Sequence, residues 1–139
     1  MRAVRVPLVA GAIAHALAWA VLLFLIFATT YTSQTVEATL PGEPPAEPVT
    51  ATATFVEVNG LSALAIVATP VALTGLALLG LLAFRDRHAR RIAWLWVSTI
   101  GVIGFCFVAI YSVGLLYLPA GVALMVAALA DLARRDTAA

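Results

Sequence analysis

Residues Leu61–Arg91 read LSALAIVATPVALTGLALLGLLAFRDRHARR, and this stretch decides the fold. A helix needs about 20 mainly apolar residues to cross a hydrocarbon core about 30 Å thick. The apolar part, 61–84, is long enough. The arginines that follow resist passage through lipid and hold the next connection on one side of the membrane. The stretch therefore predicts a membrane-spanning helix over 61–84 that ends in a short basic connection, 85–91.

The composition of the whole chain agrees with a lipid environment. Its 139 residues are 63% hydrophobic and 11% charged, whereas soluble domains are about 25% charged. A small globule in water still exposes much of its chain, so it could not bury that much apolar surface. The net charge of +1 provides no general attraction for nucleic acid. We therefore expect an integral membrane protein whose surroundings are the lipid bilayer, with no nucleic-acid partner.

Three further apolar stretches predict helices over 7–28, 92–112 and 115–133. The predicted fold is an all-α membrane protein, a four-helix transmembrane bundle in which short connections join antiparallel helices. The chain, 1–139, forms one integral membrane domain. Pro119 disfavours a helical Leu118. The fourth helix therefore either begins at Pro119, only about 22 Å long, or starts with the apolar segment 115–118 at the outer interface.

The charged residues are segregated between the two sides of this arrangement. The acidic outer loop, 29–59, contains four glutamates and neither Arg nor Lys. The arginines lie before the first span, between the second and third, and after the fourth: Arg2, Arg5, Arg85, Arg87, Arg90, Arg91, Arg134 and Arg135. These topology determinants predict a multi-pass protein with both termini in the cytoplasm. The apolar run of the first span exceeds the usual 7–15 residues of a signal peptide, so we expect a retained anchor.

The outer loop contains two β-prone runs, Gln34–Leu40 and Val49–Val58, separated by a proline-rich segment. Threonine alternates with other residues in the second run, with the period of two that is typical of strands. One interpretation is a two-stranded ribbon that packs on the helix ends, because an isolated hairpin is marginal in water. The other is a disordered connector.

His15 is the one ionisable residue that we expect well inside a span. Ionisable groups in the membrane are functional candidates by default. A haem ligand would want a second histidine or a methionine, but no spacing motif ties His15 to His88 or Met125. The favoured interpretation is a neutral histidine that bonds a neighbouring helix and stacks near Trp19, four residues on.

Thr69, Pro70 and Thr74 lie together in the second span. Pro70 removes one backbone hydrogen bond and frees the carbonyl of Ile66. The threonine hydroxyls can satisfy groups near the resulting kink. The cluster is either a hinge or polar lining of a cavity, or else a static kink, which we favour.

Small and aromatic residues complete the predicted packing. Small residues at helical spacing allow helices to approach closely, here Ala10, Ala14 and Ala18 in the first span and Ser98, Gly101, Gly104 and Ser112 in the third. Tyrosines at the outer end predict an interfacial belt, namely Tyr31, Tyr111 and Tyr117. The single cysteine, Cys106, is expected to be buried.

The chain carries no nucleophile elbow, zinc motif or phosphate loop. We therefore expect no catalytic residues, no cofactor, no metal site and no enzyme activity. A carboxylate-coupled transporter would need an acidic residue at depth in the membrane, and none is expected near mid-membrane.

Two segments carry a family resemblance: FVEVNG at 55–60 and GLLYLPA at 114–120. The chain resembles small uncharacterised four-span bacterial integral membrane proteins, a family with no assigned activity. The absence of lysine beside abundant arginine and alanine also points to a bacterium. The resemblance implies the four-span layout and a location in the bacterial cytoplasmic membrane, and it implies no residue role.

Three hypotheses for function follow. The leading one is a non-catalytic accessory subunit or membrane-organising protein, which acts with a membrane-protein partner or as a homo-oligomer. The alternative is a pore or transporter for a neutral or hydrophobic solute, with a water-accessible cavity near His15, Thr69 and Thr74. The second alternative is a redox or haem-binding subunit that uses His15.

Overall fold

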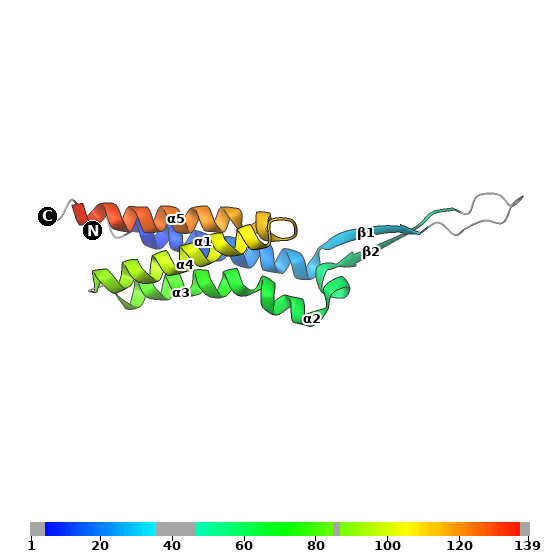
Figure 1. Ribbon diagram of the computed structural model, residues 1–139, viewed down its shortest axis with the longest axis horizontal. Helices are drawn as coiled ribbons and strands as arrows, with labels where there is room; N and C mark the ends of the chain where they lie inside the picture. The colour runs from blue at the N-terminus through cyan, green and yellow to red at the C-terminus, as the bar shows by residue number, and fades with distance from the viewer. Residues whose placement is uncertain (1–4, 36–46, 85–86, 137–139) are drawn as a thin grey trace, which may run out of the picture.

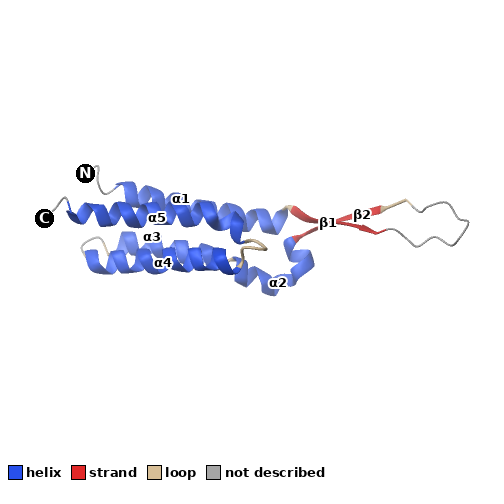
Figure 2. Ribbon diagram, turned by 45° about the horizontal axis from the view of Figure 1, so that its top comes forward, coloured by secondary structure: helices blue, strands red, loops and turns tan. Residues whose placement is uncertain are grey.

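The computed structural model describes residues 5–35, 47–84 and 87–136. Four helical segments lie side by side and a two-stranded ribbon projects from one end of the bundle (Figures 1 and 2). The helices are α1 (Arg5–Phe27), α2 (Phe55–Val67), α3 (Thr69–Ala83), α4 (His88–Val108) and α5 (Gly114–Asp136), and the strands are β1 (Thr29–Thr35) and β2 (Val49–Thr54). The "terminal end" is where α1 begins, α5 ends and α3 leads to α4; the opposite end is the "ribbon end".

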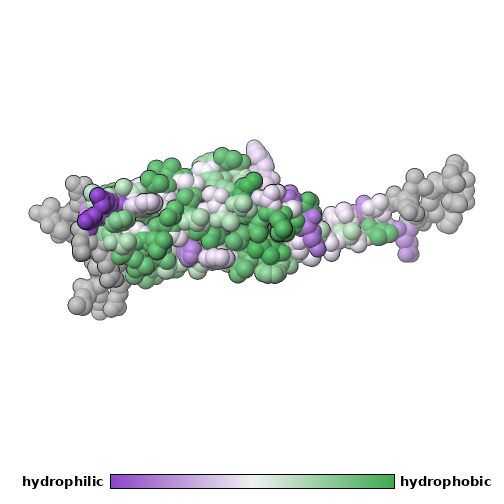
Figure 3. Space-filling view, turned by 90° about the horizontal axis from the view of Figure 1, so that it is seen from below, coloured by the Kyte–Doolittle hydropathy of each residue, from purple (hydrophilic) through white to green (hydrophobic). Residues whose placement is uncertain are grey.

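Within the described residues, four helical stretches are long and apolar enough to cross a membrane: Val6–Phe27, Phe55–Ala83, His88–Val108 and Gly114–Arg134. The space-filling view shows apolar residues along the bundle, with polar residues gathered at the terminal end and on the ribbon (Figure 3). This distribution suits a molecule whose middle lies in lipid and whose ends meet water. The predicted four-helix transmembrane bundle is confirmed.

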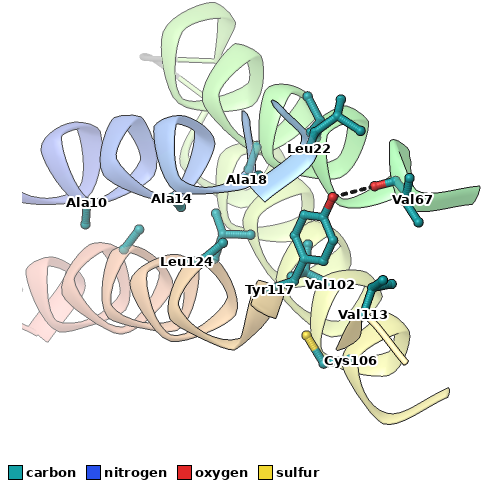
Figure 4. Packing of buried hydrophobic residues seen from close by; sticks show 14 of the residues in the cluster. Ala10, Ala14, Ala18, Leu22, Val67, Val102, Cys106, Val113, Tyr117 and Leu124 are labelled. Atoms are coloured by element: carbon teal, nitrogen blue, oxygen red, sulfur yellow. Dashed lines mark hydrogen bonds between the residues drawn. The ribbon is translucent and has the colours of Figure 1, made fainter. Parts of the chain in front are cut away.

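The bundle is a closed square in which α1 and α4 each pack against both α3 and α5. Chain order makes every neighbouring pair antiparallel. Ala10, Ala14 and Ala18 are buried, and Figure 4 shows them along α1 beside α5. Alanine side chains allow the two helix backbones to approach closely, which favours packing where lipid offers no hydrophobic driving force.

The ends of α4 differ from the predicted helix 92–112. The helix begins at His88, because the Ala and Arg residues of the basic connection are good helix formers. It ends at Val108, where the chain turns and the amide of Gly114 donates to the carbonyl of Ala109 at 2.8 Å. A Cβ at Gly114 would lie 2.7 Å from that carbonyl group, so only glycine fits this turn.

Pro119 lies inside α5, and the interpretation that the regular helix begins only at Pro119 is wrong. The helix starts at Gly114, and its 23 residues measure about 34 Å, enough to cross a hydrocarbon core. Residues 115–118 form its first turn. A membrane helix tolerates proline where neighbouring groups satisfy the backbone.

The second span, predicted as one helix over 61–84, is two helices separated at Ala68. α2 begins at Phe55, earlier than predicted, because Thr54 and Glu57 form a capping box. Asn59 lies inside α2, and its side chain donates to the carbonyl of Phe55 and to the hydroxyl of Tyr31. Gly60, with φ +77°, interrupts α2 in a conformation that L side chains rarely adopt.

The outer loop forms an antiparallel ribbon, as one of the two interpretations predicted. β1 is the threonine-rich segment Thr29–Thr35, whereas the predicted first run was Gln34–Leu40; residues 36–46 lie outside the described part. Thr32 pairs with Thr52 at the centre, and a bulge interrupts the register between Thr29 and Tyr31. The ribbon continues the long axis of the bundle away from the helices and does not cap them (Figure 1).

Candidate functional site

His15, Trp19 and Thr74 form a hydrogen-bonded cluster between α1 and α3. The indole Nε1–H of Trp19 donates to Nε2 of His15 at 3.1 Å. Indole nitrogen can only donate, so Nε2 carries the lone pair and the proton of the neutral ring is on Nδ1. Nδ1–H then donates to the hydroxyl of Thr74 at 3.0 Å. The hydroxyl in turn donates to the carbonyl of Val71 at 3.0 Å.

This chain of donors and acceptors satisfies both ring nitrogens of His15. The rings of His15 and Trp19 meet edge to face, with centroids 6.3 Å apart. The ring packs against α3 at Gly75, where a Cβ would lie 3.4 Å from Cε1 of His15. A haem iron at His15 would have to displace one of these two hydrogen bonds.

Thr69 and Pro70 lie at the break between α2 and α3, away from the His15 cluster. Pro70 occupies the first turn of α3, where its missing N–H costs nothing. The hydroxyl of Thr69 is exposed and donates to the carbonyl of Ala65 at 3.4 Å. The structure therefore unites His15, Trp19 and Thr74 and leaves Thr69 on the outer surface.

Tyr117, on α5, binds the backbone at the same break between α2 and α3. Its side chain is fully buried, and its hydroxyl donates to the carbonyl of Val67 at 2.7 Å, as Figure 4 shows. The ring also meets Phe105 edge to face. The prediction of an interfacial belt is wrong for Tyr117, because the break in the second span leaves a buried carbonyl that needs a donor.

Asp131 is the functional candidate that the sequence analysis missed. Its carboxylate, on α5, is completely buried near the terminal end. Two guanidinium nitrogens of Arg91, on α4, contact this carboxylate: Nε donates to Oδ2 at 3.0 Å, and Nη2 lies 2.9 Å from Oδ1. Arg134, one turn further along α5, lies 3.5 Å from Oδ1. The sequence did contain a signal for this site: an acidic residue inside the last predicted span, because an ionisable group in a membrane helix is a functional candidate.

His88, in the first turn of α4, completes this ionic cluster. Nη2 of Arg91 is 2.9 Å from Nδ1 of His88. Guanidinium only donates, so Nδ1 of His88 is the acceptor of this hydrogen bond. His88 Nδ1 is also 3.9 Å from Oδ2 of Asp131. Arg91 is therefore more than a topology determinant, because it joins α4 to α5 through a buried ion pair.

The other described topology determinants lie at the terminal end of the bundle. Arg87 and Arg90 are exposed at the terminal end, in the connection and the first turn of α4. Arg5 begins α1, and Arg135 lies in the last turn of α5. Arg2 and Arg85 lie outside the described residues. The placed arginines thus all belong to one end of the bundle.

Three polar contacts each join two helices: the His15 cluster joins α1 to α3, Tyr117 joins α5 to the α2–α3 break, and Arg91 with Asp131 joins α4 to α5. Within residues 5–35, 47–84 and 87–136, no three His, Cys, Asp or Glu residues lie close enough to hold a metal ion. Comparison of the chain with protein-family models, with curated proteins and with solved structures gave no match.

Proposed function

We propose that this chain is a non-catalytic accessory or organising subunit of a bacterial cytoplasmic membrane. Both termini face the cytoplasm and the ribbon faces outward. The placement of the arginines at the terminal end supports this orientation, because basic residues are retained on the cytoplasmic side.

The observation that carries the proposal is the use of polar side chains for helix packing. Two buried hydroxyls are satisfied within their own helices: that of Thr74 donates to the carbonyl of Val71, and that of Thr99 donates to the carbonyl of Leu95 at 2.7 Å. His15 and Asp131 bind side chains of neighbouring helices. In lipid such contacts hold helices together. Polar groups whose hydrogen bonds are made to neighbouring helices are not available to react with a substrate.

A pore or transporter has less support. That hypothesis needs His15, Thr69 and Thr74 to share one water-accessible cavity. Thr74 is completely buried, whereas Thr69 is exposed on the outer surface of the bundle. The three side chains therefore do not line a common path.

Photo-crosslinking in native membranes tests the proposal. A photoreactive amino acid replaces Val97, an exposed apolar residue of α4, or Thr50 on the ribbon. We expect a single crosslinked partner, present in a fixed ratio to the chain after purification in mild detergent. The matched control is the same substitution at buried Leu124, which should give only internal crosslinks.

Recovery of the chain as a partnerless monomer with no crosslink from either position would contradict the proposal. A crosslink between two copies would support the organising role over the accessory one, because the chain would then form its own assembly.

A further inference from the structure

Among the described residues, no third strand pairs with either outer edge of the ribbon. β1 reads TTYTSQT and β2 reads VTATAT, so neither strand contains a charged residue or a proline. Natural edge strands are usually shielded by lysine, proline or a covering element, because unpaired backbone groups invite another strand. Both strands are almost entirely exposed. An isolated two-stranded ribbon is also only marginally stable in water, so a third strand would stabilise it.

A glutamate lies in the sequence on each side of β2. Glu47 lies two residues before β2, Glu57 lies three residues after it, and both are exposed. β1 has a glutamate on one side only, since Glu37 follows it in the sequence but Phe27 and Ala28 precede it. The whole segment 29–59 contains no Arg or Lys to neutralise these carboxylates. A strand that adds to β2 therefore meets an uncharged backbone edge with a carboxylate near each end.

A shallow hollow on the ribbon, lined by both strands, can receive a side chain. Its volume is about 250 Å³. Small residues on the ribbon leave the space, and the lining consists of Tyr31, Thr32, Ser33, Ala51, Thr52, Ala53 and Val58. Pockets for alternate side chains give strand addition its specificity, while main-chain hydrogen bonds give it affinity.

We propose that the β2 edge binds an extended segment of a partner protein as a third strand. The segment has about six residues with small or apolar side chains, to match the length of β2, and lysine or arginine at both ends. The outer segment 29–59 of a second copy fits poorly, because it brings the same carboxylates and contains no Arg or Lys to meet them. This inference rests on the proposed function, since it names the chemistry of the partner that an accessory subunit would contact.

The test uses the full chain in nanodiscs of zwitterionic lipid and a dye-labelled peptide, which has two arginines at each end and alternating valine and threonine between. Fluorescence anisotropy should show saturable binding that weakens as salt is added. A peptide with glutamate in place of arginine, and one with methylated central amides, should each bind at least about tenfold more weakly. Equal binding of the three peptides would overturn the proposal, as would equal binding to empty nanodiscs.

A pair of matched cysteine variants identifies the edge. Thr52→Cys on β2 and Thr32→Cys on β1 are cross-strand partners, and both positions are exposed. A strand added to β2 lies about 5 Å from β2 and about 10 Å from β1, and disulfides span Cα separations of roughly 4.4–6.8 Å. Peptides with cysteine at either of two adjacent central positions should therefore be trapped by Thr52→Cys and not by Thr32→Cys. Native Cys106 is buried and should stay silent.

Preferential trapping at Thr32→Cys would overturn the proposal, and so would a disulfide between two copies through Thr52→Cys. Loss of both glutamates, in Glu47→Gln with Glu57→Gln, should weaken the arginine peptide about tenfold. If no peptide binds while Val97 still crosslinks a partner in native membranes, the edge proposal fails and the proposed function stands. If neither position on the chain finds a partner, the proposed function fails too.

Discussion

The neighbours of His15 in the structure change its interpretation from a functional candidate to a packing residue. An ionisable group in a span suggests function, but here Trp19 occupies one ring nitrogen and Thr74 the other. The histidine is thereby fixed in one neutral tautomer. The pair Arg91–Asp131 is the ionic counterpart, since each charge finds its compensation on the neighbouring helix. At the residue scale, polar groups in this bundle act as connectors between helices.

Replacement of Thr74 by valine tests the His15 connector. Valine keeps the shape but removes the hydroxyl, so Nδ1–H of His15 loses its acceptor. We expect the free energy of unfolding to fall by about 1 kcal/mol, the scale of interhelical hydrogen bonds in membranes, measured by reversible unfolding in mixed detergent. Thr69→Val is the matched control: its hydroxyl is exposed and bonds only its own helical segment. A loss at Thr69 equal to that at Thr74 would refute the connector.

Arg91→Met should destabilise more than the double variant Arg91→Met with Asp131→Leu. The single change removes both Arg91 contacts from a buried carboxylate, which keeps Arg134 at 3.5 Å and His88 at 3.9 Å. Loss of one partner of a buried pair costs about 3 kcal/mol or more, whereas apolar replacement of both is often nearly neutral. The same unfolding measurement reads the difference. Arg90→Met, at an exposed position, should change stability by less than about 0.5 kcal/mol. Equal loss in the single and double variants would mean that the ion pair has no such role.

At the scale of elements, the sequence predicted the spans well and their ends poorly. Span number follows from apolar length, which is a local property of the chain. The break at Ala68 was predicted only as a kink at Pro70. The sequence shows that Pro70 lacks an N–H, but it does not show which backbone conformation the preceding residues adopt. The start of α5 at Gly114 depends on a turn in which the backbone of residues 109–114 packs on itself. Contacts between distant segments decide such ends.

Tyr117 and Tyr111 show that contacts between distant segments also decide which side chains are buried. Both look like interfacial tyrosines in the sequence, but Tyr111 is fully exposed and Tyr117 is fully buried. What separates them is a carbonyl on α2, 50 positions away from Tyr117. Asp131 was missed for a similar reason, since its burial depends on Arg91, 40 positions away.

Tyr117→Phe should weaken the joint between α5 and the α2–α3 break. The change removes only the hydroxyl and leaves the buried carbonyl of Val67 without its donor. An unsatisfied buried acceptor costs about 1–3 kcal/mol, which reversible unfolding in mixed detergent would detect. Tyr111→Phe makes the identical chemical change at an exposed site and should leave stability unaltered. If the two variants behave alike, the hydroxyl of Tyr117 does not stabilise the break.

At the scale of the whole molecule, the two ends differ in both charge and structure. The described arginines belong to the terminal end, and the ribbon projects from the other end (Figure 1). In the part of the chain that the structure describes, four helical stretches long enough to cross a membrane lie between the two ends. An even number of crossings returns the chain to its starting side, which is why α1 begins and α5 ends together.

This arrangement predicts that Ala89 and Thr52 face opposite sides of the membrane. Ala89 lies in the first turn of α4 at the terminal end, Thr52 lies on the ribbon, and both are exposed. Ala89→Cys and Thr52→Cys are labelled with a membrane-impermeant maleimide in sealed vesicles of known orientation. We expect Ala89→Cys to react only from the cytoplasmic face and Thr52→Cys only from the outer face, because the arginines beside Ala89 do not cross lipid. The unsubstituted chain is the control, since buried Cys106 should react only after unfolding. Labelling of both positions from one side would mean that the helices do not span the membrane, and labelling from the two reversed sides would invert the orientation and place the β2 edge in the cytoplasm.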